Sequence, residues 1–418
     1  MSARAPGRGR RPVLAIDGGK PVRSTPMPAR RLFGEKEKQA AVELFDQAIR
    51  TGEAFGYNGP QEQAFEREFA QFMGGGFADG VNSGTGAIFT ALGALELEPG
   101  SEVIVPPITD PGGVMPVVVL NCVPIFADSD ARSYNMGPEQ FEAALTDGTR
   151  AAVVAHIAGE PADMGPIMEL ARARRIRVIE DCAQAHGARY RGQLVGTFGD
   201  LAAFSTMSGK HFATGGQGGI LYTRSEELYW KARRFADRGK PFNLPGAASN
   251  VVAGLNLNLN ELAAAIGRVQ LKKLPPIIER RRKVGEAVKR GAAGLKAVSF
   301  GWQVPETDPT YWFLRIALDL SRLSVGKERF VEALVAEGIP AFASYRHIQA
   351  ESLWYRNRRI GWCPWLFSDR APDPPVLKNA IAVTDSHFNL PVHENYGEQE
   401  AADIVEALSK VAAAYLRT

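Results

Sequence analysis

Residues 201–222, LAAFSTMSGKHFATGGQGGILY, contain the features that decide the fold. The apolar run at 202–205 predicts a buried strand, a turn of small residues follows, and Lys210 stands at the end of that turn. Four glycines in five positions come next, before a second apolar run at 220–222. A lysine held by such a rigid backbone suits amine chemistry, because desolvation lowers its pKa and a free amine attacks carbonyl groups. The alternative is a solvated surface lysine, so partners elsewhere in the chain must support the hypothesis.

The composition is ordinary for a globular protein, with 418 residues of which 45% are hydrophobic and 23% are charged. This length predicts about two or three domains. The net charge of +3 gives no support for a nucleic-acid or membrane partner. The 3 cysteines are scattered without a CxxC pair, so we expect no metal site, no disulfide framework and a cytoplasmic location. No signal peptide and no transmembrane run are recognisable.

Alternating helix and strand patterns predict a parallel sheet covered by helices on both faces. Helices are expected at 35–51, 61–72, 164–174, 226–238 and 257–274, and short apolar strands at 103–105, 152–156 and 177–180. We expect 1–12 to be a disordered basic tail, 13–274 a large domain that includes the N-terminal segment, and 275–418 a smaller α+β domain. The boundary is placed at Pro275 and Pro276, because a double proline should end the preceding helix.

Polar or flexible residues follow several of the predicted strands, where ligands bind in such sheets. Gly84 and Thr85 open a helix, Asp110 follows the strand at 103–105, and Asp181 comes directly after VIE. We therefore expect them to share one rim of the sheet with Lys210.

Each of these features has two interpretations. A Gly-Thr-Gly turn at a helix start is either an anion site suited to phosphate or a plain helix capped by Ser83 or Thr85. Asp181 is either the counter-ion of a bound cation or a structural cap or ion-pair partner. His186 is interpreted as a core histidine rather than a site residue.

Taken together and in order, five motifs resemble the DegT/DnrJ/EryC1/StrS family of pyridoxal-phosphate (PLP) sugar aminotransferases over nearly the whole chain. They are LAIDGGKPVR, NSGTGAI, VIEDCAQAHGA, FSTMSGKHFATGGQGG and GLNLNLNELAAAIGRVQLKKL. The resemblance implies the aspartate-aminotransferase-like fold type I, an α/β fold whose large domain has a mostly parallel sheet. It also implies PLP as the cofactor and a homodimer with shared active sites.

The resemblance assigns catalytic roles to two residues. Lys210 would form a Schiff base with PLP and, once freed by the amino donor, move a proton between the donor carbon and the cofactor's C4′. Asp181 would keep the pyridine nitrogen protonated, so that the ring draws electrons from the reacting carbon. Gln184 would hydrogen-bond the ring hydroxyl.

The remaining assigned residues bind the phosphate. Gly84, Thr85 and Ser205 would supply N–H and hydroxyl donors. Asn256 resembles the family residue that reaches the phosphate of the neighbouring subunit.

Three departures from the family pattern concern the substrate side. Asp110 stands where many members have an aromatic residue stacked on the PLP ring. Leu257 and Asn258 replace a frequent aromatic-Arg pair, so an arginine near the substrate is missing. The glycine stretch after Lys210 is one residue longer than usual.

The expected reaction is transfer of an amino group from L-glutamate or L-glutamine to a keto-sugar or keto-cyclitol, in natural-product or amino-sugar biosynthesis. The loop at 345–364, rich in Trp, Tyr and Arg, is expected to contact the substrate. One alternative is a PLP-dependent dehydratase or lyase, although Lys210 stands where the family's dehydratases have histidine. Another is a non-catalytic regulator that keeps the fold.

Overall fold

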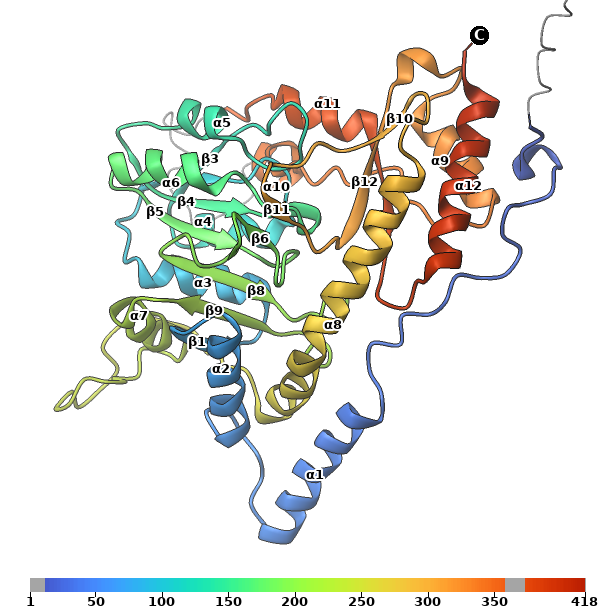
Figure 1. The fold of residues 1–418 in the computed structure, drawn as a ribbon. Helices are drawn as coiled ribbons and strands as arrows, with labels where there is room; N and C mark the ends of the chain where they lie inside the picture. The colour runs from blue at the N-terminus through green and yellow to red at the C-terminus, as the bar shows by residue number, and fades with distance from the viewer. Residues whose placement is uncertain (1–11, 358–372, 418) are drawn as a thin grey trace, which may run out of the picture.

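The computed structural model describes residues 12–357 and 373–417. At its centre lies a seven-stranded sheet (Figure 1) in the order β1 (Phe77–Val81), β9 (Gly219–Thr223), β8 (Leu201–Ser205), β5 (Arg177–Asp181), β4 (Thr149–Ala155), β2 (Glu102–Val105) and β3 (Val123–Phe126). Neighbouring strands from β8 to β3 are parallel, whereas β9 is antiparallel to both β8 and β1. The expectation of a mostly parallel α/β sheet is confirmed.

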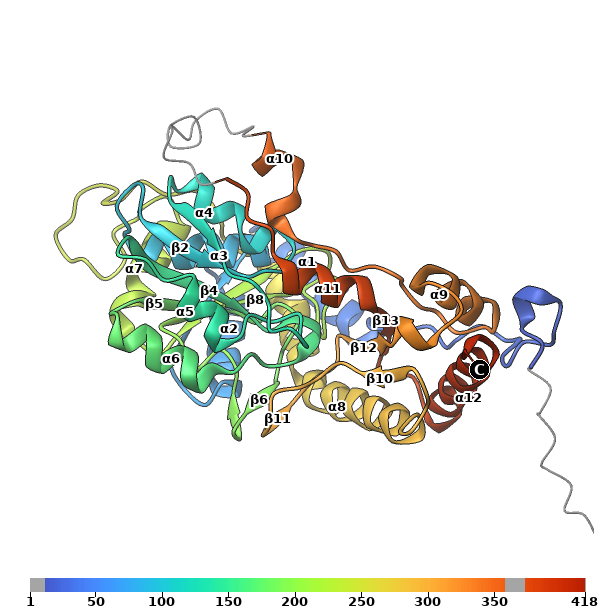
Figure 2. The same ribbon diagram turned by 90° about the horizontal axis from the view of Figure 1, so that it is seen from above.

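Helices cover both faces of this sheet (Figure 2). One face is packed by α3 (Gly84–Ala94), α4 (Met115–Val119) and α7 (Glu226–Ala236). The other is packed by α2 (Pro60–Phe72), α5 (Pro138–Ala143), α6 (Met164–Ala173) and α8 (Glu261–Gly291). Because helices bury both faces of the sheet, both faces are apolar. Successive strand residues point to opposite sides, so Ile179 packs on the first face and Val178 on the second.

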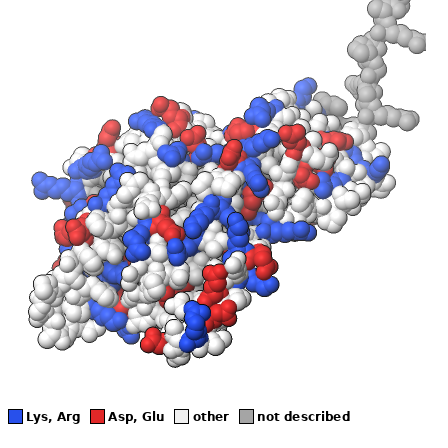
Figure 3. Space-filling view, turned by 60° about the horizontal axis from the view of Figure 1, so that its bottom comes forward, with Lys and Arg blue, Asp and Glu red and all other residues white. Residues whose placement is uncertain are grey.

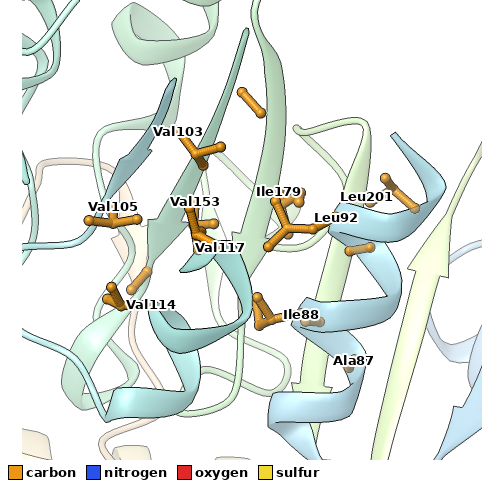
Figure 4. Close-up of a cluster of buried hydrophobic side chains, with 14 of the residues drawn as sticks. Ala87, Ile88, Leu92, Val103, Val105, Val114, Val117, Val153, Ile179 and Leu201 are labelled. Carbon is orange, nitrogen blue, oxygen red and sulfur yellow. The ribbon is translucent and has the colours of Figure 1, made fainter. Parts of the chain in front are cut away.

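The first face shows how the core holds the site elements in place (Figure 4). Val103, Val153 and Ile179 project from three strands toward Ile88 and Leu92 of α3. Burying side chains of this size stabilises the fold by about 1.5–3 kcal/mol each. The start of α3 is therefore fixed against the carboxyl ends of the strands.

A second core lies in the C-terminal part of the chain. Here a three-stranded antiparallel sheet, in the order β10 (Val298–Phe300), β12 (Phe313–Leu318) and β13 (His387–Pro391), packs with α9 (Lys327–Ala336), α12 (Glu398–Tyr415) and the end of α8. The other α-helices of the described residues are α1 (Glu35–Thr51), α10 (Leu353–Arg356) and α11 (Lys378–Ser386). A small separate sheet consists of β11 (Thr307–Asp308), β6 (Arg189–Tyr190) and β7 (Gln193–Leu194).

The double proline does not end a helix. Pro275 and Pro276 lie inside α8, which runs for 31 residues and connects the two cores (Figure 1). Proline inside a helix costs about 3 kcal/mol. Leu271 and Leu274 are buried in one core and Val288 in the other, which offsets this cost. The predicted helix end at 274 is wrong, and the division of the chain near 275 stays a prediction.

The N-terminal segment contacts both parts of the chain: Arg30 donates to the carbonyl of His211 and Leu32 accepts from Gln270, while its first residues pack on the C-terminal core. Leu14 belongs to the C-terminal core. The backbone N–H groups of Ala15 and Val22 donate to the buried carboxylate of Glu337, which follows α9. The predicted basic tail, 1–12, lies outside the described residues except for its last position.

The surface carries both signs of charge, mixed over the face drawn in Figure 3, as the small net charge requires. Within 12–357 and 373–417, none of the helices has the length and apolar character that crossing a bilayer demands.

A cluster of buried acids lies between α2, β1 and α7. Glu66 and Asp79 share the guanidinium of Arg233, whose Nη1 lies 2.7 Å from Asp79 Oδ1 and 3.2 Å from Glu66 Oε1. Glu62 is buried beside them and accepts from the backbone N–H of Asn58. Burial, reinforced by the charge of Glu66, raises the pKa of Glu62 to about 8. Burial likewise raises the pKa of Asp79 to about 7. The folded chain therefore holds protons here that the unfolded chain releases near pH 4 to 5.

We predict that the stability of the protein falls as pH rises from about 5 to about 8, because these carboxyls must ionise while buried. The Glu62→Gln variant should reduce this fall by at least about 1 kcal/mol, since one pKa unit corresponds to about 1.4 kcal/mol. Unfolding midpoints in urea at pH 5.5 and 8 provide the measurement. Glu35→Gln, on the exposed surface of α1, is the matched control. An unchanged pH slope in Glu62→Gln would contradict the prediction.

Candidate active site

The first part of the site is the N-terminus of α3. The Ser83 hydroxyl accepts from the N–H of Gly86 at 2.9 Å, so Ser83 is the capping residue. The N–H groups of Gly84 and Thr85, in the first turn, have no intrahelical acceptor. A Cβ atom at Gly84 would lie 2.7 Å from the Cβ of Ser205, so β8 ends directly against this turn. The helix start thus offers free donors at its positive end.

The second part is Asp181, the last residue of β5. Its Oδ1 accepts from the N–H of Ala183 at 3.0 Å, which fixes the carboxylate at the end of the strand. Burial raises the pKa of Asp181, and the N–H of Ala183 and the charge of Lys210 oppose that shift. An acid in this position holds a hydrogen bond to a cationic partner strongly, because little water competes for it.

The third part is Lys210, which ends the turn after β8. Its side chain is 8% exposed, and its Nζ lies 4.2 Å from the centre of the Trp312 ring. The indole N–H of Trp312 donates to the carbonyl of Gly209 at 2.9 Å, so the ring is tied to the lysine's own turn. Burial lowers the pKa of Lys210, while Asp181 and then Asp110 raise it. Burial therefore favours the neutral amine, which is the nucleophilic form.

These parts meet in one cavity of about 200 Å³. Five of the predicted site residues line it together with Asp110 and others. The lining residues are Ser83, Gly84, Thr85, Ile88, Asp110, Gly112, Gly113, Asp181, Ala183, Ser205, Met207, Lys210 and Gln217. The expected rim of polar and flexible residues is therefore present as one site.

The glycine stretch after Lys210 makes this close packing possible. A Cβ atom at Gly219 would lie 2.2 Å from the carbonyl oxygen of Ser83. At Gly218 it would meet the hydroxyls of Thr206 and Thr214 within 2.4 Å. No larger residue fits at either position without moving the start of α3 or the end of β8.

Gln184 lies next to the cavity but is not among the residues that line it. Its Oε1 accepts from the N–H of Ala158 at 2.9 Å, and its Nε2 donates to the hydroxyl of Tyr345 at 2.6 Å. The Tyr345 ring stacks on Tyr134 with centres 6.2 Å apart. Burial raises the pKa of Tyr345, so this phenol stays protonated.

Asn256 lies outside the cavity. It forms an isolated bridge with Asp237, and its Oδ1 accepts from Nδ2 of Asn258 at 2.7 Å. The side chain is exposed within this chain. Its role toward a neighbouring subunit stays a prediction.

His186 is a core residue, as interpreted from the sequence. It is fully buried, with ring centres of Phe212, Phe204 and His211 at 5.2 to 5.5 Å. Burial lowers its pKa to about 3, so the ring is neutral.

Beneath Asp181, the side chains of His156, Glu180 and Cys182 lie close enough to share a metal ion. However, the carboxylate of Glu180 and both ring nitrogens of His156, which would be the metal ligands, are already engaged in hydrogen bonds. Glu180 accepts from His156 Nε2 and from three backbone N–H groups at 196–199, and His156 Nδ1 accepts from Ala162. This network anchors the end of β5, on which Asp181 stands.

The sequence did not identify Trp312 as a site residue, and it identified Tyr345 only as part of a loop. Both come from the C-terminal part of the chain, where sequence spacing says nothing about the distance to Lys210. The loop at 345–364 begins with the Tyr345 contact and continues into α10; its positions 358–364 lie outside the described residues.

The mostly parallel sheet covered by helices, with a smaller antiparallel sheet in the C-terminal part, is the fold type I architecture of PLP-dependent aminotransferases. The chain belongs to the DegT/DnrJ/EryC1/StrS aminotransferase family, whose sequence profile matches residues 35–409. It is therefore an aminotransferase, and its cofactor is PLP.

Comparisons with individual proteins agree with this assignment. The chain is 36% identical over 353 residues to dTDP-3-amino-3,4,6-trideoxy-alpha-D-glucose transaminase of Streptomyces venezuelae, covering 84% of this chain and 86% of the relative. It is 30% identical over 431 aligned positions to L-glutamine:2-deoxy-scyllo-inosose aminotransferase of Micromonospora echinospora, covering 96% and 97%. The structure resembles that of DesV from S. venezuelae in complex with a ketimine intermediate, with a TM-score of 0.78, 28% identity, and coverage of 90% and 95%.

We predict that Gly84→Ala weakens PLP binding at least about tenfold, because the new methyl group forces apart the start of α3 and Ser205. Titration of the apoenzyme with PLP, followed by absorbance, measures the affinity. Gly216→Ala is the matched control, since a Cβ there meets nothing within 4 Å. Equal affinities for the two variants would show that the close approach does not matter.

Proposed function

We propose that the protein transfers an amino group from L-glutamate or L-glutamine to the keto group of a keto-sugar or keto-cyclitol. The observation that carries this proposal is the single cavity in which Lys210, Asp181 and the start of α3 meet. The names of the two relatives support the substrate class, since one is a sugar nucleotide transaminase and the other acts on a cyclitol with L-glutamine.

Lys210 is proposed to hold the cofactor's aldehyde and, when free, to move a proton between the donor carbon and the cofactor. Both tasks need a neutral amine, which burial favours by lowering the pKa. The Trp312 ring, whose centre lies 4.2 Å from Nζ, stabilises the protonated form of Lys210 by a cation–π interaction.

Asp181 is proposed to hold a proton on the pyridine nitrogen of the cofactor. Bound PLP supplies an electron sink for the carbon that loses its proton, and this sink depends on the ring being protonated. The fixed position of the carboxylate on β5, supported by the N–H of Ala183, suits that task.

The phosphate of PLP is proposed to bind at the start of α3. Gly84 and Thr85 offer N–H groups there, and the hydroxyl of Ser205 lies against the same turn. Gln184 is proposed to bind the ring hydroxyl with Nε2, the group that contacts Tyr345 in this structure.

A homodimer is proposed to complete the site through Asn256. The exposed apolar side chains of Val42, Phe45 and Ile49 on α1, which projects from the body of the molecule in Figure 1, support an interface on this side. Transfer is favoured over dehydration because the residue at the reacting position is Lys210 and not histidine.

We predict that Lys210→Ala still binds PLP through the phosphate but forms no covalent link with it. Borohydride treatment should fix the cofactor to the wild-type chain and to the Lys283→Ala control, whose lysine is exposed on α8. Mass spectrometry of the treated proteins measures the link. A borohydride-fixed cofactor in Lys210→Ala would remove this residue from its proposed role.

We predict that Asp181→Ala lowers turnover at least about 100-fold, the cost of losing about 3 kcal/mol of transition-state stabilisation. A cofactor analogue methylated at the ring nitrogen carries the positive charge permanently and should restore part of the rate. Asp308→Ala, on the exposed surface of β11, serves as the control. Near-normal turnover, or no rescue by the analogue, would reject the proposed role.

The substrate class is tested directly with the aminated cofactor form of the enzyme. Its absorbance should return to that of the aldehyde form when a suitable keto-cyclitol or nucleotide-linked keto-sugar is added. Release of ammonia from the added substrate would indicate elimination and would contradict transamination.

A further inference from the structure

Asp110 is an acidic residue of the cavity that the proposed chemistry does not use. It opens a short 3-10 helix, Pro111–Gly113, and its Oδ1 accepts from the N–H of Gly112 at 3.0 Å. Its side chain is exposed and lines the cavity beside Lys210 and Asp181. One carboxylate oxygen thus fixes the turn, while the residue lines the cavity that also holds Lys210 and Asp181.

The turn that carries Asp110 is tightly held. A Cβ atom at Gly112 would lie 2.2 Å from the hydroxyl oxygen of Thr85, and one at Gly113 would lie 3.3 Å from Oδ2 of Asp181. The residue before the turn, Thr109, donates to the carbonyl of His347 and accepts from Gln349. The carboxylate of Asp110 therefore keeps a defined position between the helix start and the acid of β5.

Among the described residues that line the cavity, acidic side chains outnumber basic ones. Among the described residues that line it, two are acids and one is an amine, and none is an arginine. The negative charge of Asp110 contributes to raising the pKa values of Asp181, Lys210 and Tyr345, so its field extends across the site. The phosphate of bound PLP adds further negative charge.

We propose that Asp110 is a specificity-determining residue that selects keto substrates carrying an ammonium group, such as an amino-substituted keto-cyclitol, over neutral or carboxylate-bearing ones. This inference rests on the proposed function. A cation beside a fixed carboxylate gains attraction, whereas a carboxylate there is repelled. The polyol hydroxyls of a neutral substrate can also donate to Asp110, but they gain less because they carry no charge.

The experiment uses the holoenzyme in its aminated cofactor form, so that only the acceptor half-reaction is observed. Single-turnover rates are measured by absorbance with three ketones: an amino-substituted keto-cyclitol, the neutral keto-cyclitol of the same ring, and 2-oxoglutarate. In Asp110→Asn, which keeps the oxygen that accepts from Gly112, the preference for the amino ketone over the neutral one should fall about tenfold. The rate with 2-oxoglutarate should rise in the same variant.

Opposite changes for the cationic and anionic ketones separate a charge effect from damage to the site, which would slow both. Asp319→Asn is the matched control, because Asp319 also opens a 3-10 helix, Leu320–Arg322, and accepts from the N–H two residues on. An unchanged preference in Asp110→Asn, or equal losses with all three ketones, would overturn the inference. If neither keto-cyclitol reacts with the wild type while 2-oxoglutarate does, keto-cyclitols fail as acceptors; a 2-oxoglutarate rate that does not rise in Asp110→Asn would by itself overturn the charge effect assigned to Asp110.

Discussion

The close approach of three backbone segments is the constraint on which the rest of the structure depends. The turn at Ser83 and Gly84, the end of β8 at Ser205 and the start of β9 at Gly219 lie so near one another that a single added Cβ would collide with a neighbouring atom. Because β8 and β9 are neighbours in the sheet, Lys210 in their connection is carried to the start of α3. An amine and a set of free N–H donors therefore face the same small cavity.

Electrostatics within this cavity are a balance of opposing effects. Burial favours a neutral Lys210 and a neutral Asp181, while each of the two, when charged, favours the charged form of the other. The Trp312 ring lets the protonated amine remain in a site with little water. Because Asp181 and Asp110 both raise the pKa of Lys210, the loss of either carboxylate favours the neutral amine further.

The C-terminal core contributes to the site although it is a separate packing unit. Helix α8 connects both cores, and β12 begins next to Trp312. Tyr345 reaches back to Gln184 through one hydrogen bond. The aromatic contacts of Lys210 and Gln184 are therefore supplied by residues more than 100 positions after Lys210, and their geometry depends on how the two cores are joined.

The sequence by itself determined the α/β class, the bounds of α1, a cap at Ser83 or Thr85, between which the structure selects Ser83, and five of the residues that line the cavity. It could do so because these features depend on local patterns: apolar strands, glycine turns and polar residues at strand ends. Tertiary structure alone decided that α8 continues through Pro275 and Pro276, since burial on both sides outweighs the lost hydrogen bonds. It also decided that the segment after residue 13 packs on Glu337 and that Trp312 covers Lys210. Such contacts join positions far apart in the chain, and no local pattern records the distance between them.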